Sequence, residues 1–166
     1  MFKTDVTAFA RRHEGRFELV TFHHSLEHIP DQFGALQAAA NLLTRNGACI
    51  VRIPALPCRA WDVYGTDWVE LDAPRHLYIH SRSSITTLAE RAGLRLEQLG
   101  FDTTAFEFFG SEQYKQDVPL SDPSSLWINP ESPLFTEEEK RRFEDLARTA
   151  NQTKTAGRAV FMFRKT

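Results

Sequence analysis

Residues 17–31 read FELVTFHHSLEHIPD, and this stretch decides the fold. A short apolar run rich in β-forming residues changes abruptly into three histidines, a serine and a glutamate, and a proline follows. The run predicts a buried strand at residues 18–22 that delivers polar side chains at its carboxyl end. Because ligands of open α/β sheets bind in the crevice at that end, we expect the chemistry of the protein here.

Length and composition predict one domain over residues 1–166. A chain of 166 residues with 42% hydrophobic residues can bury a core of its own but is too short for two ordinary domains. The 20 Lys and Arg residues nearly balance the 22 Asp and Glu residues, and no basic run stands out. We therefore expect no nucleic acid and no membrane surface as partner.

Cysteine usage indicates a reducing compartment. Cys49 falls within an apolar run, and Cys58 follows nine residues later, which predicts two reduced thiols rather than a cysteine-based metal or redox site. The N-terminus lacks the apolar core of a signal peptide, and no run approaches the roughly 20 apolar residues of a membrane span. We expect a cytoplasmic protein.

A strand, a helix and a second strand are expected in succession. Asp31 is a favourable N-cap for a helix with an apolar face, and Asn46-Gly47 predicts the end of that helix. The apolar run at residues 48–53 predicts a second buried strand. Such a βαβ crossover is almost always right-handed, so the two strands should be parallel neighbours. Since both faces of the first strand are apolar or small, helices should cover both of its sides.

Residues 54–80 show no periodicity and predict a long loop, which is usually a functional feature such as a lid or pocket wall. Trp61, Tyr64 and Trp68 are interleaved with charged residues in this loop. These aromatic side chains form either the apolar wall of a substrate pocket or the small core of the loop itself.

The second half of the chain predicts further helices and strands. Ser81 can cap a helix that ends at Gly93, and residues 94–101 are typical of a strand. Residues 158–164 are apolar on both faces, which predicts a last strand inside the sheet. Alternating strands and helices of this kind define an α/β fold.

An irregular insertion is expected between these last two strands. Residues 102–135 contain four prolines and many serines and aspartates, with a short helix expected near residues 111–115. Thr136 then opens a capping box with Glu139 and predicts the start of another helix.

The polar residues after the first strand offer metal ligands. If the chain turns helical there, His24 and His28 lie four residues apart on one face with Glu27 between them, and imidazole plus carboxylate suits a divalent metal. His76 and His80 are later candidates for the same site. The alternative is that these histidines cap the strand or line a pocket, since no spacing matches a closed structural zinc site.

His76 is also a candidate general base, because imidazole titrates near neutral pH and a loop over a crevice can place it on a substrate hydroxyl. The alternative is a helix-entry histidine that packs against Trp68. Other catalytic signatures do not occur in the sequence, which has no Gly-x-Gly-x-x-Gly run, no P-loop and no Gly-x-Ser-x-Gly elbow.

Three stretches together resemble a known family. They are residues 17–31, the run Leu42-Leu43-x-x-x-Gly47 before the second strand, and WVELDAPRHL at residues 68–77. The combination is similar to the second half of class I S-adenosylmethionine-dependent methyltransferases, in their bacterial small-molecule branch. The resemblance extends over about residues 15–115.

The resemblance implies a partial Rossmann-like methyltransferase sheet. In the family, seven strands run in the order 3-2-1-4-5-7-6 with strand 7 antiparallel. Residues 18–22, 48–53, 94–101 and 159–163 would be strands 4, 5, 6 and 7. The glycine-rich cosubstrate motif follows strand 1 of the family and would precede Met1, so the resemblance implies a truncated domain that binds S-adenosylmethionine weakly or not at all by itself.

The resemblance also implies roles for side chains near the end of the first strand. His23, His24 and Ser25 would line the methionine side of S-adenosylmethionine. Either His24 or His76 would remove the proton of the methyl acceptor. The loop at residues 54–80 would wall the acceptor pocket.

A metal site is the further implication. Some relatives hold a divalent metal with a Glu-x-x-Glu-His run and a later histidine. The matching residues here are Glu27, His28 and His76, while His24 replaces the first glutamate. Since imidazole suits softer metals, magnesium is disfavoured at this site.

Two functions follow from these expectations. The first is transfer of a methyl group from S-adenosylmethionine to an oxygen or nitrogen of a small-molecule acceptor. The alternative is a non-catalytic truncated remnant or subunit. In that case the strand at residues 18–22 is left as an unpaired edge, which invites formation of a homodimer or complementation by a partner chain.

Overall fold

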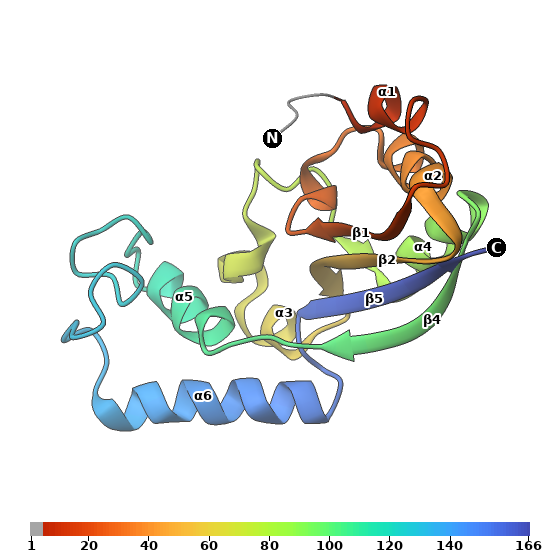
Figure 1. Cartoon of the computed structure of the whole chain (residues 1–166). Coiled ribbons are helices and arrows are strands. Elements are labelled where there is room, and N and C mark those ends of the chain that lie inside the picture. The colour runs from red at the N-terminus through yellow and green to blue at the C-terminus, as the bar shows by residue number, and fades with distance from the viewer. Residues whose placement is uncertain (1–4) are drawn as a thin grey trace.

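The computed structural model describes residues 5–166, so the first four residues of the expected domain lie outside the described part of the chain. A sheet occupies one end of the molecule, and α5 and α6 extend away from it (Figure 1). The main sheet has the order β1-β2-β5-β4, and β3 pairs with β2. The strands are β1 (Phe17–His23), β2 (Leu43–Leu56), β3 (His80–Ser81), β4 (Leu94–Phe101) and β5 (Arg158–Lys165).

Strand order and direction confirm the α/β fold with a methyltransferase-like sheet. β1 and β2 are parallel and are connected through α2 (Gln32–Leu42), while β5 is antiparallel to both β2 and β4. β1, β2, β5 and β4 therefore take the positions of family strands 4, 5, 7 and 6. β5 lies inside the sheet, as its two apolar faces predict.

The helices begin where the sequence places their N-caps. The Asp31 carboxylate accepts a hydrogen bond from the Gly34 amide, the Ser81 hydroxyl accepts one from Ser84, and Thr136 forms its capping box. The remaining α-helices are α1 (Val6–Ala10), α3 (Arg59–Tyr64), α4 (Arg82–Arg91), α5 (Phe106–Lys115) and α6 (Glu137–Gln152); the 3₁₀ helices are η1 (Leu26–His28), η2 (Gly65–Asp67) and η3 (Val69–Leu71).

The expected end of α2 at Asn46-Gly47 is wrong, because α2 ends at Leu42 and β2 begins with the next residue. Gly47 lies within β2, where a Cβ atom would come 2.9 Å from the Leu43 side chain and 3.0 Å from the Phe17 carbonyl oxygen. The glycine is therefore required for close strand contact and not for the termination of a helix.

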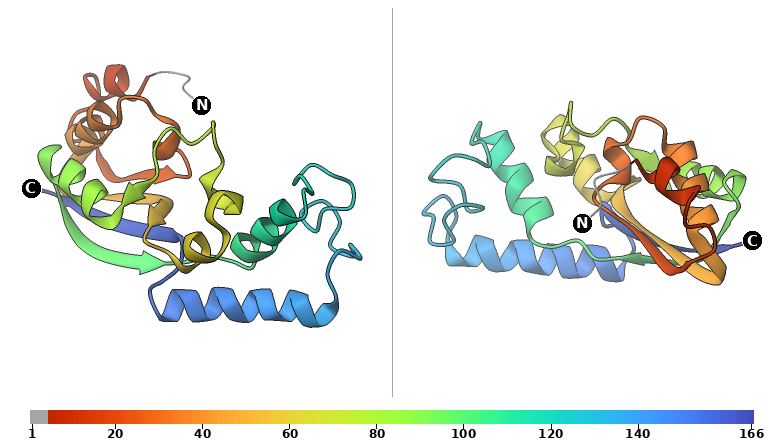
Figure 2. Two further views of the ribbon diagram at one scale, coloured as in Figure 1. Left: turned by 180° about the vertical axis from the view of Figure 1, so that it is seen from behind. Right: turned by 45° about the horizontal axis from the view of Figure 1, so that its top comes forward.

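The core lies on one face of the sheet, under α2 and α4 (Figure 2). Phe22 of β1, Val51 of β2 and Phe161 of β5 are in register on that face, and all three are buried. On the other face, Ile50 of β2 is only half-buried, and Leu19 of β1 is 52% exposed. The expectation that helices cover both sides of β1 is therefore wrong for the described residues. β1 lies at the edge of the sheet, and its second face is open to solvent.

A second hydrophobic cluster replaces the expected irregular loop at residues 54–80. This segment contains α3, η2 and η3, and Trp68 is fully buried among side chains of α5 and α6 such as Phe108 and Phe143. The Trp61 and Trp68 rings pack edge to face, with their centroids 6.2 Å apart. These aromatic residues thus form a core of their own, which is the second of the two alternatives.

The predicted short helix at residues 111–115 is longer than expected, since α5 begins at Phe106. The following residues 116–135 have no regular helix or strand, and the Gln113 side chain donates a 2.9 Å hydrogen bond to Ser125 within them. Over residues 5–166, no helix is both long enough and apolar enough to span a membrane.

Candidate functional site

A cavity of about 300 Å³ opens beside the carboxyl ends of β1 and β2. The parallel register places His23, the last residue of β1, opposite Arg52 of β2, and the chain leaves the sheet at His24. The polar lining of the cavity is His24, Arg52, Glu70, Asp72, Arg75, His76, Tyr114 and Arg158. Two candidate catalytic histidines that are 52 residues apart in sequence thus line one cavity.

The first of these, His24, is fixed by Arg52. Its backbone is in the left-handed region with φ of 45°, and its Nε2 atom lies 2.7 Å from Arg52 Nη1. The neighbouring His23 Nε2 lies 3.0 Å from the same nitrogen. Since a guanidinium can only donate, both imidazoles accept at Nε2. Arg52 is in turn held by Asp102, whose Oδ2 atom lies 2.6 Å from Arg52 Nε.

The second candidate, His76, is oriented by a hydrogen bond to the backbone. Its Nδ1 atom lies 2.8 Å from the carbonyl oxygen of Glu70 and therefore carries the proton, because a carbonyl only accepts. Its Nε2 atom faces Glu27 Oε1 at 3.9 Å and Asp72 Oδ2 at 3.8 Å. The hydrogen bond to the Glu70 carbonyl fixes the orientation of the His76 ring. Packing against Trp68, the alternative role expected for His76, does not explain that orientation.

Glu27, His28 and His76 come together, and one ligand atom from each lies within 4.8 Å of the others. Glu27 and His28 belong to η1, while His76 follows η3. His80 stands outside this group, because its ring nitrogens contact Gln32 Oε1 at 2.6 Å and Ser84 Oγ at 3.0 Å. The expectation that His80 joins the set is therefore wrong.

The Glu27 carboxylate has an unusual environment. It is 1% exposed, and burial works to raise its pKa, but the His24 and His76 imidazoles together with its own backbone outweigh this effect and hold the pKa below the ordinary value. The carboxylate is therefore an anion within the fold at neutral pH. Such an anion favours a positively charged group beside it.

The three residues expected to contact S-adenosylmethionine lie in succession at the edge of the sheet. His23 is exposed, while His24 and Ser25 are half-buried. Ser25 precedes η1, and its hydroxyl makes no capping hydrogen bond there, so that it is available to a ligand. The sequence contains no Gly-x-Gly turn for the cosubstrate.

Several cavity residues were not predicted from the sequence. Arg52 is the one charged residue in the apolar run at residues 48–53, a signal that marks it as a residue with a specific partner. The ion pair between Arg158 and Glu70 joins residues 88 apart in sequence, and no local pattern indicates it. Both arginines lie at strand positions next to the cavity, which is where the fold places binding groups.

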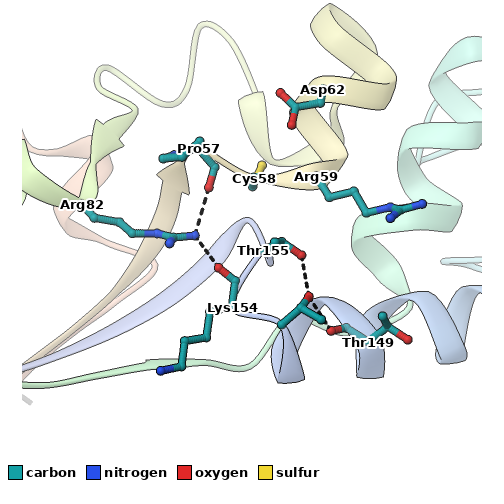
Figure 3. A pocket seen from close by; sticks show the side chains of 9 residues that line it. Pro57, Cys58, Arg59, Asp62, Arg82, Thr149, Lys154 and Thr155 are labelled. Atoms are coloured by element: carbon teal, nitrogen blue, oxygen red, sulfur yellow. Dashed lines mark hydrogen bonds between the residues drawn. The ribbon is translucent and has the colours of Figure 1, made fainter.

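A larger cavity of about 550 Å³ lies away from the histidines, between α3 and the end of α6 (Figure 3). Arg82 Nη2 donates to the carbonyl oxygens of Pro57 at 3.0 Å and Lys154 at 2.8 Å (Figure 3). The Cys58 thiol lines this cavity, but burial raises its pKa to about 12, so it is no nucleophile at neutral pH. Arg82 thus stabilises the fold here by bridging two loops.

The order of strands, the antiparallel β5 and the cavity at the strand ends define the class I methyltransferase fold. A model of the family described as "Methyltransferase domain" matches residues 2–99, and the chain belongs to this family. A search of curated proteins finds no match to the chain.

Solved structures agree with this fold. A SAM-dependent methyltransferase from Archaeoglobus fulgidus superposes with a TM-score of 0.55 at 14% identity, over 99% of this chain and 66% of that one. A protein from Galdieria sulphuraria, provisionally named a sarcosine dimethylglycine methyltransferase, superposes with a TM-score of 0.52 at 16% identity, over 93% of this chain and 54% of that one. A provisionally named methyltransferase from Bacillus halodurans superposes with a TM-score of 0.50 at 19% identity, over 92% of this chain and 70% of that one. The chain thus spans between about half and two thirds of the length of most such relatives.

Proposed function

We propose that the chain forms the acceptor side of a methyl-transfer site that uses S-adenosylmethionine and acts on an oxygen or nitrogen of a small molecule in a bacterial cytoplasm. The observation that carries this proposal is the 300 Å³ cavity where His24 and His76 converge at the carboxyl ends of β1 and β2. A cavity of this size suits a metabolite, and its position is the usual ligand crevice of an open α/β sheet.

The proton of the acceptor would go to one of the two histidines. His76 is better placed, because its Nδ1–H is held by the Glu70 carbonyl, and its Nε2 atom, which lies beside the Glu27 and Asp72 carboxylates, accepts no hydrogen bond from the described residues. The Asp72 carboxylate, 3.8 Å from that Nε2, would stabilise the imidazolium that forms. His24 Nε2 already accepts from Arg52 and would have to exchange that partner before it could act as a base.

S-adenosylmethionine, when bound, supplies an electrophilic methyl group on sulfur. His23, His24 and Ser25 would contact its methionine end, and the rest of the catalytic effect would come from holding the acceptor in line with that methyl group. Because the sequence offers no glycine-rich turn for the cosubstrate, weak binding by this chain is part of the proposal.

Isothermal titration calorimetry with S-adenosylmethionine tests the proposal. We expect weak, saturable binding at millimolar ligand, and weaker binding for the Ser25→Ala variant. The matched control is Ser83→Ala, an exposed serine on α4. An absence of binding at millimolar cosubstrate would overturn the enzymatic function of this chain, though not its family membership.

A non-catalytic role is the second candidate, and the open edge of β1 favours it. Within residues 5–166, β1 pairs with β2 alone, and the adjoining sheet face carries the exposed Leu19. An unpaired apolar edge is a template for another strand. In this role β1 pairs with a second copy of the chain and forms a homodimer. The alternative is that a strand of a different partner chain pairs with β1 and complements the sheet.

The oligomeric state tests the second candidate. We expect a dimer by light scattering at high protein concentration, and a shift toward monomer for Leu19→Lys, because a charge on an edge strand opposes pairing. The matched control is Val63→Lys on α3, since Val63 is also exposed but lies away from the edge. A strictly monomeric parent contradicts homodimerisation, and a dimer that both variants retain excludes this edge as its interface.

A further inference from the structure

We propose that the cavity beside Arg82 binds a small organic molecule that carries an anionic oxygen group, either a carboxylate or a phosphate. This cavity of about 550 Å³ lies between α3 and the end of α6 and shares no lining residue with the cavity of about 300 Å³ at the strand ends (Figure 3). Its volume is in the range of pockets that hold small molecules. Ligand binding there would be a second activity, separate from methyl transfer.

Arg82 is a half-buried cation without an anionic partner. Three other arginines within residues 5–166 are half-buried, and each of them pairs with a carboxylate: Arg52 with Asp102, Arg158 with Glu70 and Arg164 with Glu97. Arg82 forms no ion pair with any described residue. Because a charge that is withdrawn from water costs free energy unless it is paired, an anion beside Arg82 is favoured.

The guanidinium group of Arg82 is held in place but has donors left over. Its Nη2 atom donates to the carbonyl oxygens of Pro57 and Lys154, and its Cζ atom lies 4.6 Å from the centroid of the Phe101 ring. Nη1 donates to no described residue, and Nε is buried without a hydrogen-bond partner. Three of the five N–H groups are therefore unused, and an oxyanion is the acceptor that such a group binds most strongly.

The charged residues around the cavity are mostly basic. Arg59 on α3 and Lys154 in the turn after α6 line it together with Arg82, whereas Asp62 is the one acidic residue of the lining. Arg59 and Lys154 are exposed, and neither forms an ion pair within residues 5–166. Three cations against one anion attract a negatively charged ligand, and none of the three has to give up a carboxylate to bind it.

The frame of the cavity is preformed and offers apolar contacts. The Arg59 amide donates a 2.8 Å hydrogen bond to the Thr155 carbonyl oxygen and so joins the two sides. The Thr153 hydroxyl donates to the Thr149 carbonyl oxygen and lies 2.9 Å from the Thr155 hydroxyl (Figure 3). Since these two hydroxyls bond within the protein and the Cys58 thiol is uncharged, the remaining wall suits the uncharged body of an organic molecule.

Isothermal titration calorimetry with phenyl phosphate, benzoate and neutral benzyl alcohol tests the proposal in the absence of S-adenosylmethionine. We expect one molecule of at least one of the two anions to bind per chain, and benzyl alcohol not to bind at the same concentration. Binding should weaken as the salt concentration rises, because salt screens the three cations. Tighter binding of phenyl phosphate would assign a phosphate to the ligand, and tighter binding of benzoate a carboxylate.

Variants locate the anion. Arg82→Gln and the double variant Arg59→Gln/Lys154→Gln should each weaken binding about 10-fold or more, because each removes hydrogen bonds to a charged group. The matched control is Arg12→Gln, an exposed arginine that lines neither cavity and should bind as the parent does. Arg82 also bridges two loops, so circular dichroism checks its fold. The double variant changes only exposed side chains and decides the question if Arg82→Gln unfolds.

Three results would overturn the anion site. The first is the absence of binding of both anions by the parent chain at millimolar concentration. The second is equal binding by the parent and the double variant, which would place the anion elsewhere on the chain. The third is binding of benzyl alcohol as tight as that of the anions. Since no measurement here uses S-adenosylmethionine, failure of the anion site leaves the methyl-transfer proposal untouched.

Discussion

The indole nitrogen of Trp68 donates a 3.1 Å hydrogen bond to Oε1 of Glu107, and both side chains are fully buried. The same carboxylate accepts from the Gly157 amide at 2.9 Å. Burial, with a contribution from nearby Glu70, raises the pKa of Glu107 to about 7. Three segments of the second hydrophobic cluster thus meet at one acid that is half protonated near neutral pH.

This acid makes the free energy of unfolding depend on pH. In the unfolded chain Glu107 titrates near 4.5, and in the folded chain near 7, so between these values the folded state binds more protons. Stability contributed by Glu107 is therefore complete below about pH 4.5 and is lost as the pH rises to 7, by about 3 kcal/mol as an order of magnitude. We expect Glu107→Gln to remove this loss. The free energy of unfolding of the variant, measured with denaturant, should therefore rise relative to that of the parent from pH 5 to pH 8. A constant difference between the two proteins would contradict the assignment.

Gly157 should tolerate no side chain. A Cβ atom there would overlap Glu107 Oε1 and come 2.6 Å from the Trp68 ring and 3.1 Å from Cys58 Sγ. We expect Gly157→Ala to lower the free energy of unfolding by roughly 1–3 kcal/mol, as overpacked cores do. Gly100→Ala in β4 is the control, because its nearest neighbour, the Val160 carbonyl oxygen, would be 4.0 Å away. Equal stability of the two variants is the result that contradicts this prediction.

The ion pair between Glu70 and Arg158 beside the cavity should be strongly coupled. Their side chains are 5% and 12% exposed, so removal of one partner leaves a charge with little solvent. We expect Glu70→Ala to lower the free energy of unfolding by about 3 kcal/mol, and the double variant Glu70→Ala/Arg158→Met to recover much of that loss. A double-mutant cycle in urea measures the coupling. Additive effects of the two single substitutions would show that the pair is not coupled.

Both cysteines should resist modification in the folded protein. Cys49 and Cys58 are free and buried, and burial raises the pKa of each thiol to about 12. The thiolate is the reactive form, so we expect little reaction with a disulfide reagent at pH 8 until the chain is unfolded, when two thiols should react. Rapid reaction of either thiol in the folded state would contradict the buried position.

The sequence predicts the elements better than it predicts their surroundings. Asp31, Ser81 and Thr136 cap helices because each bonds to an amide three residues away, and such local chemistry is visible in the sequence. The end of α2 was predicted wrongly, because Gly47 serves a contact with Phe17 that local patterns do not reveal.

The candidate site divides in the same way. Glu27 and His28 are neighbours in sequence and were predicted together. His76 was one of two later candidates for the same site, and the family resemblance selected it. Arg158 depends on pairing with Glu70, far away in the chain, and was missed. The open face of the sheet was also missed, because a strand with apolar residues on both sides looks the same in sequence whether or not a helix covers it.

The edge position of β1 sets the order in which backbone amides should exchange with solvent deuterium. β5 is bonded to strands on both sides, so its amides open only when the sheet does, and they should exchange last. In β1 the amides that point away from β2 have no strand partner among the described residues and should exchange first. Slow exchange along the outer side of β1 would therefore reveal that something has paired with it in solution.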